Sequence, residues 1–272
     1  MTFSTFGYES RFGLEYDPFL KNSKEAFVET SETKEVMTRL NTLAGTNGFG
    51  LLTGAPGRGK TTCIRKWSQS LNPSLYKVVY TSLSTLTVND FYRNLVSNFG
   101  IQPNYRKPEN FKLIQSEINR YVFEKKITPV IILDEANHIG PAILHDLKII
   151  FNFEMDSKDR AVVLLAGLPV LNNTLSLNVH EALRQRFVMN YNIEGIPKAE
   201  GRLYIQKKLE RAGATRNVFE DNAVEAILNA ADGTPRVIDR LCSYSLQIAN
   251  ALSLQTINAD TITKTISDIQ LV

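Results

Sequence analysis

Five short apolar runs alternate with helical patterns up to about residue 195. The runs begin at residues 49, 77, 129, 161 and 187, and helical patterns lie between them near 60–70, 88–98, 109–125, 140–152 and 170–185. Strands that are apolar at nearly every position are buried on both faces of a sheet. The pattern therefore predicts an α/β fold: a doubly wound, five-stranded parallel sheet with helices on both sides.

The rest of the chain has a different pattern. From Pro197 onward the periodicity is helical throughout, near 197–212, 219–231, 235–252 and 258–269, with glycines after the first two helices. Residues 1–30 are aromatic and irregular, and a helix follows from about Ser31. We expect an N-terminal arm at 1–30, an αβα domain at 31–195 and a small all-helical lid at 196–272.

Composition narrows the class of protein. The chain has 272 residues, of which 43% are hydrophobic and 22% charged, and a net charge of +3 permits a nucleic-acid partner without requiring one. It begins without a secretory signal pattern, and its apolar runs fall short of the roughly 20 residues of a membrane span. We expect a cytoplasmic protein without membrane association, with Cys63 and Cys242 as buried thiols.

The stretch "LLTGAPGRGKTT" carries the clearest chemistry. Gly54, Gly59, Lys60 and Thr61 match the phosphate-loop pattern G-x-x-x-x-G-K-[ST] between a predicted strand and a predicted helix. Such a loop curves its backbone N–H groups around a phosphate at the positive end of the helix. The predicted nucleotide contacts are Gly54, Ala55, Pro56, Gly57, Arg58, Gly59, Lys60, Thr61 and Thr62. The alternative is an ordinary glycine-rich turn.

A second part of the same site is expected in "PVIILDEAN". A buried strand that ends in two carboxylates is costly unless the acids face a cation or a reacting water. We expect the Thr61 hydroxyl to hold Mg²⁺ and Asp134 to hold the ion indirectly, from outside its direct ligands. We expect Lys60 to reach the β- and γ-phosphates of ATP, and Glu135 to orient the attacking water. The alternative is a pair of solvated acids. With the loop present, ATP cleavage is the expected reaction.

These motifs resemble the AAA+ ATPases. Within that family the sequence is similar to the branch that contains the transposition regulators TnsC, TniB and MuB and the ExeA/GspA secretion ATPases. The resemblance is carried by "DPF", "GFGLLTGAPGRGKTT", "VIILDEAN", "LLAGLPVL", "ALRQRF" and "GTPRVIDRL", which follow the family's order over most of the chain.

The resemblance implies roles for three arginines. In "ALRQRF", Arg186 resembles the arginine finger that reaches a neighbouring subunit's site, with Arg184 as the other candidate. In "GTPRVIDRL", Arg236 resembles the sensor-2 arginine that touches the γ-phosphate from the lid. The alternative is that these are solvated surface cations near helix ends.

One position departs from the family pattern. The polar residue that usually follows the fourth strand, a sensor for the γ-phosphate and the water, would fall near Gly167 or Leu168, and neither has a polar side chain. We expect slow or partner-dependent hydrolysis, and a long-lived ATP state.

The expected function depends on which members of this AAA+ branch the sequence resembles, the secretion ATPases or the transposition regulators. ExeA/GspA ATPase domains are usually followed by a membrane span, and the present sequence contains none, which favours transposition. The resemblance then implies a homo-oligomeric ring, spiral or filament that assembles on double-stranded DNA without sequence preference, recruits a transposase and disassembles on hydrolysis. Predicted DNA contacts are Ser84, Thr85, Arg106, Lys107 and Lys112, with ordinary polar loops as the alternative. The alternative functions are a secretion-associated ATPase and a replication initiator or helicase loader.

Overall fold

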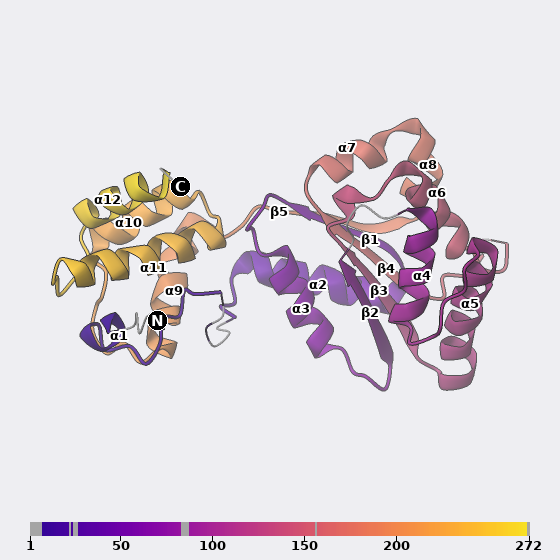
Figure 1. The fold of residues 1–272 in the computed structure, drawn as a ribbon, viewed down its shortest axis with the longest axis horizontal. Coiled ribbons are helices and arrows are strands. Elements are labelled where there is room, and N and C mark those ends of the chain that lie inside the picture. The colour runs from indigo at the N-terminus through magenta and orange to yellow at the C-terminus, as the bar shows by residue number, and fades with distance from the viewer. Residues whose placement is uncertain (1–6, 22, 24–26, 83–86, 156, 271–272) are drawn as a thin grey trace. The chain divides into compact units, whose positions relative to one another are not determined.

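The computed structural model describes residues 7–21, 23, 27–82, 87–155 and 157–270 (Figure 1). The chain divides into two compact units. The sheet unit comprises residues 35–56 and 60–193, and the helical unit comprises residues 1–34, 57–59 and 194–272.

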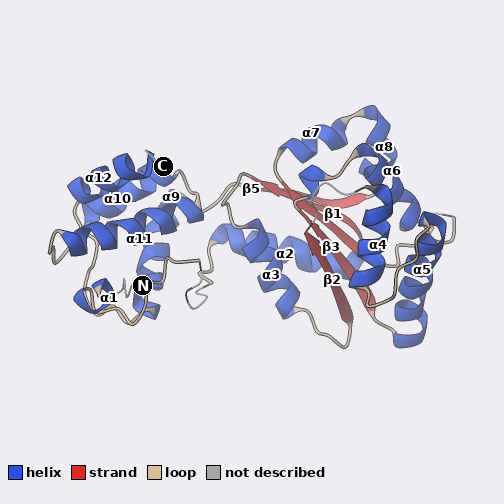
Figure 2. Ribbon diagram, in the orientation of Figure 1, coloured by secondary structure: helices blue, strands red, loops and turns tan. Residues whose placement is uncertain are grey.

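The sheet unit is built on five parallel strands (Figure 2). They are β1 (Gly48–Gly54), β2 (Tyr76–Ser82), β3 (Thr128–Asp134), β4 (Val162–Gly167) and β5 (Phe187–Ile193), in the order β2-β3-β4-β1-β5. The predicted five-stranded parallel sheet is confirmed, and each predicted apolar run corresponds to one strand. Because all strands are parallel, their carboxyl ends lie at one edge of the sheet, where ligands bind in such folds.

Separate apolar cores cover the two faces of the sheet. One core joins the strands to α2 (Ser31–Thr46) and α3 (Lys60–Ser70), and the other joins them to α4 (Val88–Asn98), α5 (Lys107–Asn119) and α6 (Pro141–Ile150). Successive residues of β3 alternate between these cores. This two-sided burial explains why the strands are apolar at nearly every position, and it confirms the doubly wound arrangement.

Two predicted helices differ from the observed ones. The helix predicted at 109–125 begins at Lys107 and ends in a π-helical segment, Arg120–Lys125. The helix predicted at 170–185 is divided into α7 (Val170–Ser176), a 3-10 turn and α8 (Glu181–Arg184). The division occurs because Leu177 has an extended backbone, with ψ 141°, which interrupts the helical hydrogen bonding.

The helical unit has one apolar core of its own. Its helices are α1 (Tyr8–Arg11), α9 (Lys198–Arg211), α10 (Asp221–Ala231), α11 (Pro235–Ala251) and α12 (Ala259–Gln270). The four helices predicted after Pro197 are present close to their predicted bounds. The aromatic residues Tyr8, Phe12 and Phe19 of the N-terminal arm are buried in the same core, so part of the arm that the sequence predicted as irregular packs as an element of this unit.

Asp17 of the "DPF" motif attaches the arm to the helical unit. Its buried carboxylate accepts hydrogen bonds from the Tyr8 hydroxyl at 2.9 Å, the Ser243 hydroxyl at 2.6 Å and the Phe19 N–H at 2.8 Å. Burial and the neighbouring charge of Asp17 raise the pKa of Tyr8, which keeps the donor protonated. A buried carboxylate is tolerated only when such partners are present.

Both cysteines are buried, as predicted, one in each unit. Burial also raises the pKa of the Cys242 thiol, so little reactive thiolate forms at this position. Within the described ranges, no helix combines the length and apolar composition that a bilayer crossing requires.

We therefore predict that a thiol reagent such as DTNB labels neither Cys63 nor Cys242 in the native protein at about pH 8, and both after denaturation. The measurement is the absorbance of released thionitrobenzoate over time. Rapid labelling of either thiol without denaturant would contradict the prediction and would indicate local opening around that cysteine.

Candidate functional site: the phosphate loop and the acidic end of β3

The loop after β1 has the backbone of an anion-binding turn. Gly57 and Gly59 have φ angles of 78° and 99°, a region that residues with a side chain rarely adopt. Gly54 is packed so closely against β5 that an added Cβ would lie 3.0 Å from the Ile193 carbonyl oxygen. Glycine is thus required at these three positions for the loop to turn from β1 into α3.

Lys60, the first residue of α3, folds back onto this loop. Its side chain is largely buried, and its ammonium group donates hydrogen bonds to the Gly54 carbonyl at 2.7 Å and the Ala55 carbonyl at 3.2 Å. A phosphate bound in the loop would accept charge-assisted hydrogen bonds from this ammonium group.

Asp134 ends β3 and lies beside the first turn of α3. It is only 2% exposed, and its Oδ2 accepts a hydrogen bond from the Thr61 hydroxyl at 3.0 Å, while Oδ1 accepts one from the Glu135 N–H at 2.9 Å. Among the residues that the structure describes, no cation pairs with it. A buried carboxylate that meets only neutral donors is suited to a cation.

This pair of oxygen donors fits Mg²⁺. Magnesium is usually held by one or two protein oxygen ligands together with substrate phosphates and water. The described ranges contain no group of three or more His, Cys, Asp and Glu side chains that could hold a metal ion by themselves. The Thr61 hydroxyl and the Asp134 carboxylate are therefore the residues that would hold the ion, with the phosphates completing its shell.

Tyr80 of β2 also contacts Asp134, a role that sequence reasoning missed. Its hydroxyl donates a hydrogen bond to Oδ2 of Asp134 at 3.0 Å. Burial, followed by the charge of Asp134, raises the pKa of Tyr80 to about 12, so the hydroxyl stays protonated as a donor. In the sequence, Tyr80 is marked only as part of a predicted strand. Its contact with Asp134 depends on β2 pairing with β3 in the register that places Ser82 opposite Asp134, and the sequence pattern does not give that register.

Glu135 has an unusual backbone conformation at the end of β3. Its φ is 55°, in the left-handed region, and a 3-10 turn follows it at Ala136–His138. For a residue with a Cβ this conformation costs about 1–2 kcal/mol. Its side chain is exposed, in contrast to the neighbouring Asp134. The turn thus separates one buried acid, suited to a metal, from one accessible acid, suited to a water molecule.

The same turn places Asn137 at the end of β4, where the sequence lacks the family's polar sensor. The Oδ1 atom of Asn137 accepts a hydrogen bond from the Leu168 N–H at 2.9 Å. A Cβ added to Gly167 would lie 2.8 Å from that oxygen and 3.0 Å from the Asn137 backbone nitrogen. Asn137 therefore fills the space that a side chain at position 167 would need, and a polar group stands at this strand end.

The two candidate finger arginines have different surroundings. The Arg186 side chain is 11% exposed, and its guanidinium donates hydrogen bonds to the Lys148 carbonyl at 2.9 Å and the Phe151 carbonyl at 3.2 Å at the end of α6. Arg184 is exposed, and donates one hydrogen bond to the Ser176 carbonyl at 2.8 Å. In this single copy the Arg186 side chain is held beside α6, whereas Arg184 lies on the surface, and the finger role stays a prediction for both.

Arg58 and Arg236 belong to the helical unit. Arg236 is exposed in the first turn of α11, and its backbone N–H lies 3.4 Å from the Gly57 carbonyl oxygen. The guanidinium of Arg58 donates hydrogen bonds to the carbonyls of Asp232, at 2.6 Å, and of Glu194. The predicted nucleotide contact at Arg58 can thus involve its backbone while the side chain binds these carbonyls.

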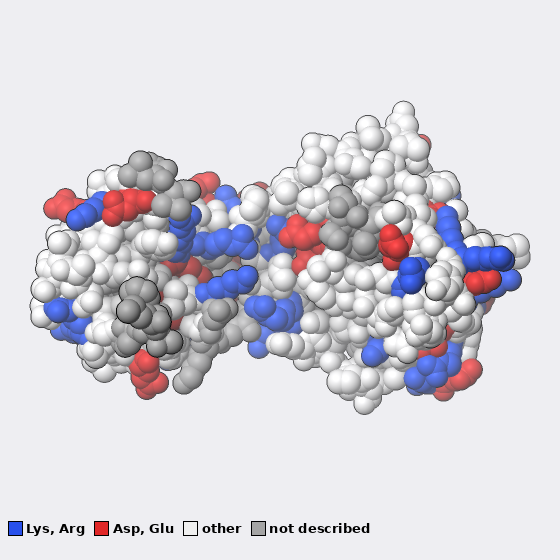
Figure 3. All heavy atoms as spheres, viewed as in Figure 1, with Lys and Arg blue, Asp and Glu red and all other residues white. Residues whose placement is uncertain are grey.

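Three of the five predicted DNA contacts lie within the described residues. Ser84 and Thr85 lie outside the described residues. Arg106, Lys107 and Lys112 are exposed at the start of α5, and Lys107 also forms an ion pair with the buried Asp146 at 2.6 Å. In the view of Figure 3, Lys and Arg atoms are scattered among Asp and Glu and do not form a continuous basic stripe. Arg106, Lys107 and Lys112 are therefore the exposed cations of the predicted set among the described residues, and Lys107 already has one anionic partner.

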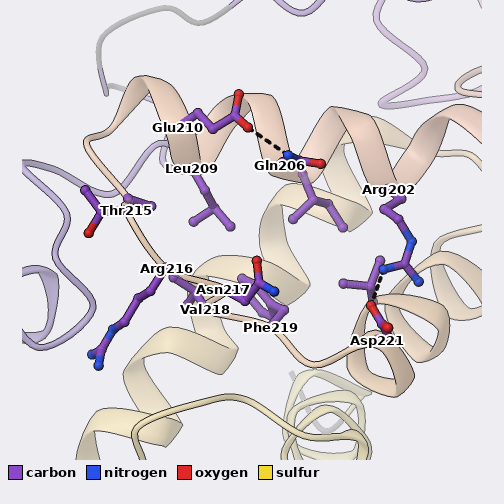
Figure 4. A pocket seen from close by; sticks show the side chains of 13 residues that line it. Arg202, Gln206, Leu209, Glu210, Thr215, Arg216, Asn217, Val218, Phe219 and Asp221 are labelled. Carbon is purple, nitrogen blue, oxygen red and sulfur yellow. Dashed lines mark hydrogen bonds and ion pairs between the residues drawn. The ribbon is translucent and has the colours of Figure 1, made fainter.

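A hollow of about 620 Å³ in the helical unit lies between α9 and the segment 214–219 (Figure 4). Its polar side chains largely pair with one another: Gln206 donates to Glu210 at 2.8 Å, and Arg202 pairs with Asp221. It contains none of the predicted site residues, and we assign it no role in the site.

The comparisons with known proteins agree with this geometry. Residues 43–175 match the family model of the AAA domain, a segment that includes the phosphate loop and both acids. These residues form an AAA domain. The chain is also 30% identical over 249 residues to general secretion pathway protein A of Aeromonas hydrophila, covering 90% of this chain and 45% of that protein. The chain thus spans less than half of the length of this relative. On this chain, the similarity extends beyond the AAA domain at residues 43–175.

The similarity to solved structures with the same fold extends over both units of the chain. Cdc6p from Pyrobaculum aerophilum has a TM-score of 0.70 at 15% identity, covering 92% of this chain and 70% of that one. The Aeropyrum pernix ORC1 protein, solved in complex with DNA, has a TM-score of 0.64 at 17% identity, covering 93% and 68%. The fold is that of a P-loop AAA+ ATPase, as expected. The relation to GspA is confirmed, and the resemblance to TnsC, TniB and MuB stays a prediction.

The contact between Asn137 and Gly167 yields a stability prediction. Gly167→Ser, which would restore a polar side chain at the family's sensor position, should lower the free energy of unfolding by about 1–3 kcal/mol because the new side chain collides with Asn137. Denaturant unfolding measures the change. Gly140→Ser is the matched control, since an added Cβ there meets nothing within 4 Å. Equal stability of the two variants would contradict the prediction.

Proposed function

We propose that the AAA domain hydrolyses ATP in a magnesium-dependent reaction. The observation that carries this proposal is the hydrogen bond from Thr61 to Asp134, which joins the phosphate loop to the acidic end of β3. Lys60 would bind the β- and γ-phosphates, Thr61 and Asp134 would hold the ion, and Glu135 would orient the attacking water. Bound Mg²⁺ would neutralise developing charge on the phosphate oxygens.

Beyond hydrolysis, we propose that ATP-bound copies assemble on double-stranded DNA as a ring, spiral or filament and regulate transposition by recruiting a transposase. Support comes from the motifs of the transposition branch, from exposed Arg106 and Lys112, and from the fold shared with an ORC1 protein solved in complex with DNA. Contacts to the phosphate backbone would be independent of sequence. Hydrolysis would release the subunits.

A secretion-associated ATPase is the second candidate. The 30% identity to general secretion pathway protein A, over 90% of this chain, favours it. In that role the ATPase site would be the same, and the exposed cations of α5 would have no nucleic-acid partner. The two candidates therefore differ in whether nucleotide controls retention on DNA.

The first test measures retention on a duplex of arbitrary sequence. We expect wild type to bind with ATP and to lose about tenfold in affinity between roughly 50 and 200 mM salt if two phosphates are contacted. Glu135→Gln should lower kcat by about 100-fold or more and prolong retention. Lys60→Ala is the control that should neither bind ATP nor remain on the duplex.

Two results would contradict this DNA-switch proposal. Retention that is equal with and without ATP would show that nucleotide does not control binding. An absence of retention under every condition, with ATPase activity intact, would favour the secretion-associated function.

The arginines provide a test of assembly. We propose that Arg184, and not the largely covered Arg186, is the finger that reaches a neighbouring copy. Arg184→Ala should keep its thermal stability and ATP affinity and lose about 10³-fold in kcat. Arg186→Ala should lose about 1–3 kcal/mol of stability, because the Lys148 and Phe151 carbonyls lose their guanidinium donor.

Mixing two inactive variants makes this test independent of either one alone. Arg184→Ala copies retain Glu135, and Glu135→Gln copies retain Arg184, so mixed assemblies contain some complete sites. Measured ATPase activity should reappear on mixing. If activity stays absent while the variants co-assemble, Arg184 does not act across the interface.

A further inference from the structure

Tyr80 and Thr61 share one acceptor, Oδ2 of Asp134. Each hydroxyl donates to it at 3.0 Å, one from the edge strand β2 and the other from the first turn of α3. The remaining oxygen of Asp134, Oδ1, accepts the Glu135 N–H at 2.9 Å. Both carboxylate oxygens are therefore held, and rotation of the carboxylate about χ2 would break bonds on either side.

The two hydroxyl groups are not equivalent. Thr61 is the predicted magnesium ligand, and its oxygen can offer a lone pair to the ion while its O–H continues to donate to Asp134. Tyr80 belongs neither to the phosphate loop nor to the acidic strand end, and its side chain is 46% exposed. Tyr80 thus serves to orient the Asp134 carboxylate: it holds Oδ2, while the Glu135 N–H holds Oδ1.

We propose that Tyr80 is a positioning residue for magnesium, which rests on the proposed ATPase function. Its hydroxyl fixes the Asp134 carboxylate in the orientation that, together with Thr61, binds the metal of Mg·ATP. Polar groups that orient a metal ligand typically change metal affinity by about 10- to 100-fold when they are removed. Because Tyr80 is one hydrogen bond away from the ligand, its effect should appear in metal affinity before it appears in nucleotide affinity.

The test uses Tyr80→Phe, which keeps the ring and removes only the hydroxyl. Binding of a non-hydrolysable ATP analogue is measured by calorimetry over a series of Mg²⁺ concentrations and without metal. Magnesium should increase the affinity for the analogue, and we expect the Mg²⁺ concentration that gives half of this increase to be about tenfold higher in the variant than in wild type. Affinity without metal and the melting temperature should be unchanged, and kcat should return near the wild-type value at saturating Mg²⁺.

Tyr76→Phe is the matched control. Tyr76 lies on the same strand, and its hydroxyl makes no hydrogen bond with any described residue. Its Mg²⁺ dependence should equal that of wild type. If Tyr80→Phe also keeps the wild-type Mg²⁺ dependence, the proposal is overturned.

The remaining outcomes are separable. A Tyr80→Phe variant that melts lower, or that loses metal-free affinity by the same factor, would show a structural role and would overturn the positioning role. If wild type binds the analogue with no magnesium dependence at all, the proposed magnesium-dependent reaction fails, independently of the result for Tyr80.

Discussion

The hydrogen bond between Thr61 and Asp134 connects the two halves of the candidate site across an intervening strand of the sheet. In the order β2-β3-β4-β1-β5, β4 separates the strand that enters the phosphate loop from the strand that ends in the acids. The first turn of α3 crosses that gap and brings its hydroxyl to the acid at 3.0 Å. The space over the end of β4 is therefore where phosphate, metal and water would have to meet.

The glycine at the end of β4 follows from that constraint. With no side chain, Gly167 leaves room for the turn that continues from Glu135, and Asn137 enters it and binds the Leu168 N–H. The left-handed backbone of Glu135 makes this path possible. In the sequence, this departure from the family pattern is a missing polar residue. In the structure, Asn137 from the turn after β3 supplies the polar group at the end of β4.

The sequence was sufficient to predict the strands, the loop and the buried acid, because each is a local pattern: apolar runs, glycine spacing, and carboxylates after a buried strand. Tyr80 and Asn137 could not be predicted in the same way, since their contacts depend on strand order and on one unusual φ angle. The choice between Arg184 and Arg186 also required the fold. Two residues apart in sequence, one binds the end of α6 and the other lies on the surface.

Charge burial suggests why such a domain would be silent until nucleotide and neighbour are both present. Lys60 and Asp134 are largely buried; the Lys60 ammonium donates to two carbonyls, and Asp134 accepts from two hydroxyls and the Glu135 N–H. Mg·ATP carries the opposite charges toward both. A further cation at the γ-phosphate would have to be an exposed residue that is held only weakly in its own copy, and Arg184 is exposed with one hydrogen bond, to the Ser176 carbonyl. Since the guanidinium of Arg186 is bound to two carbonyls beside α6, the exposed Arg184 is better suited to cross to another copy, and hydrolysis would then depend on assembly.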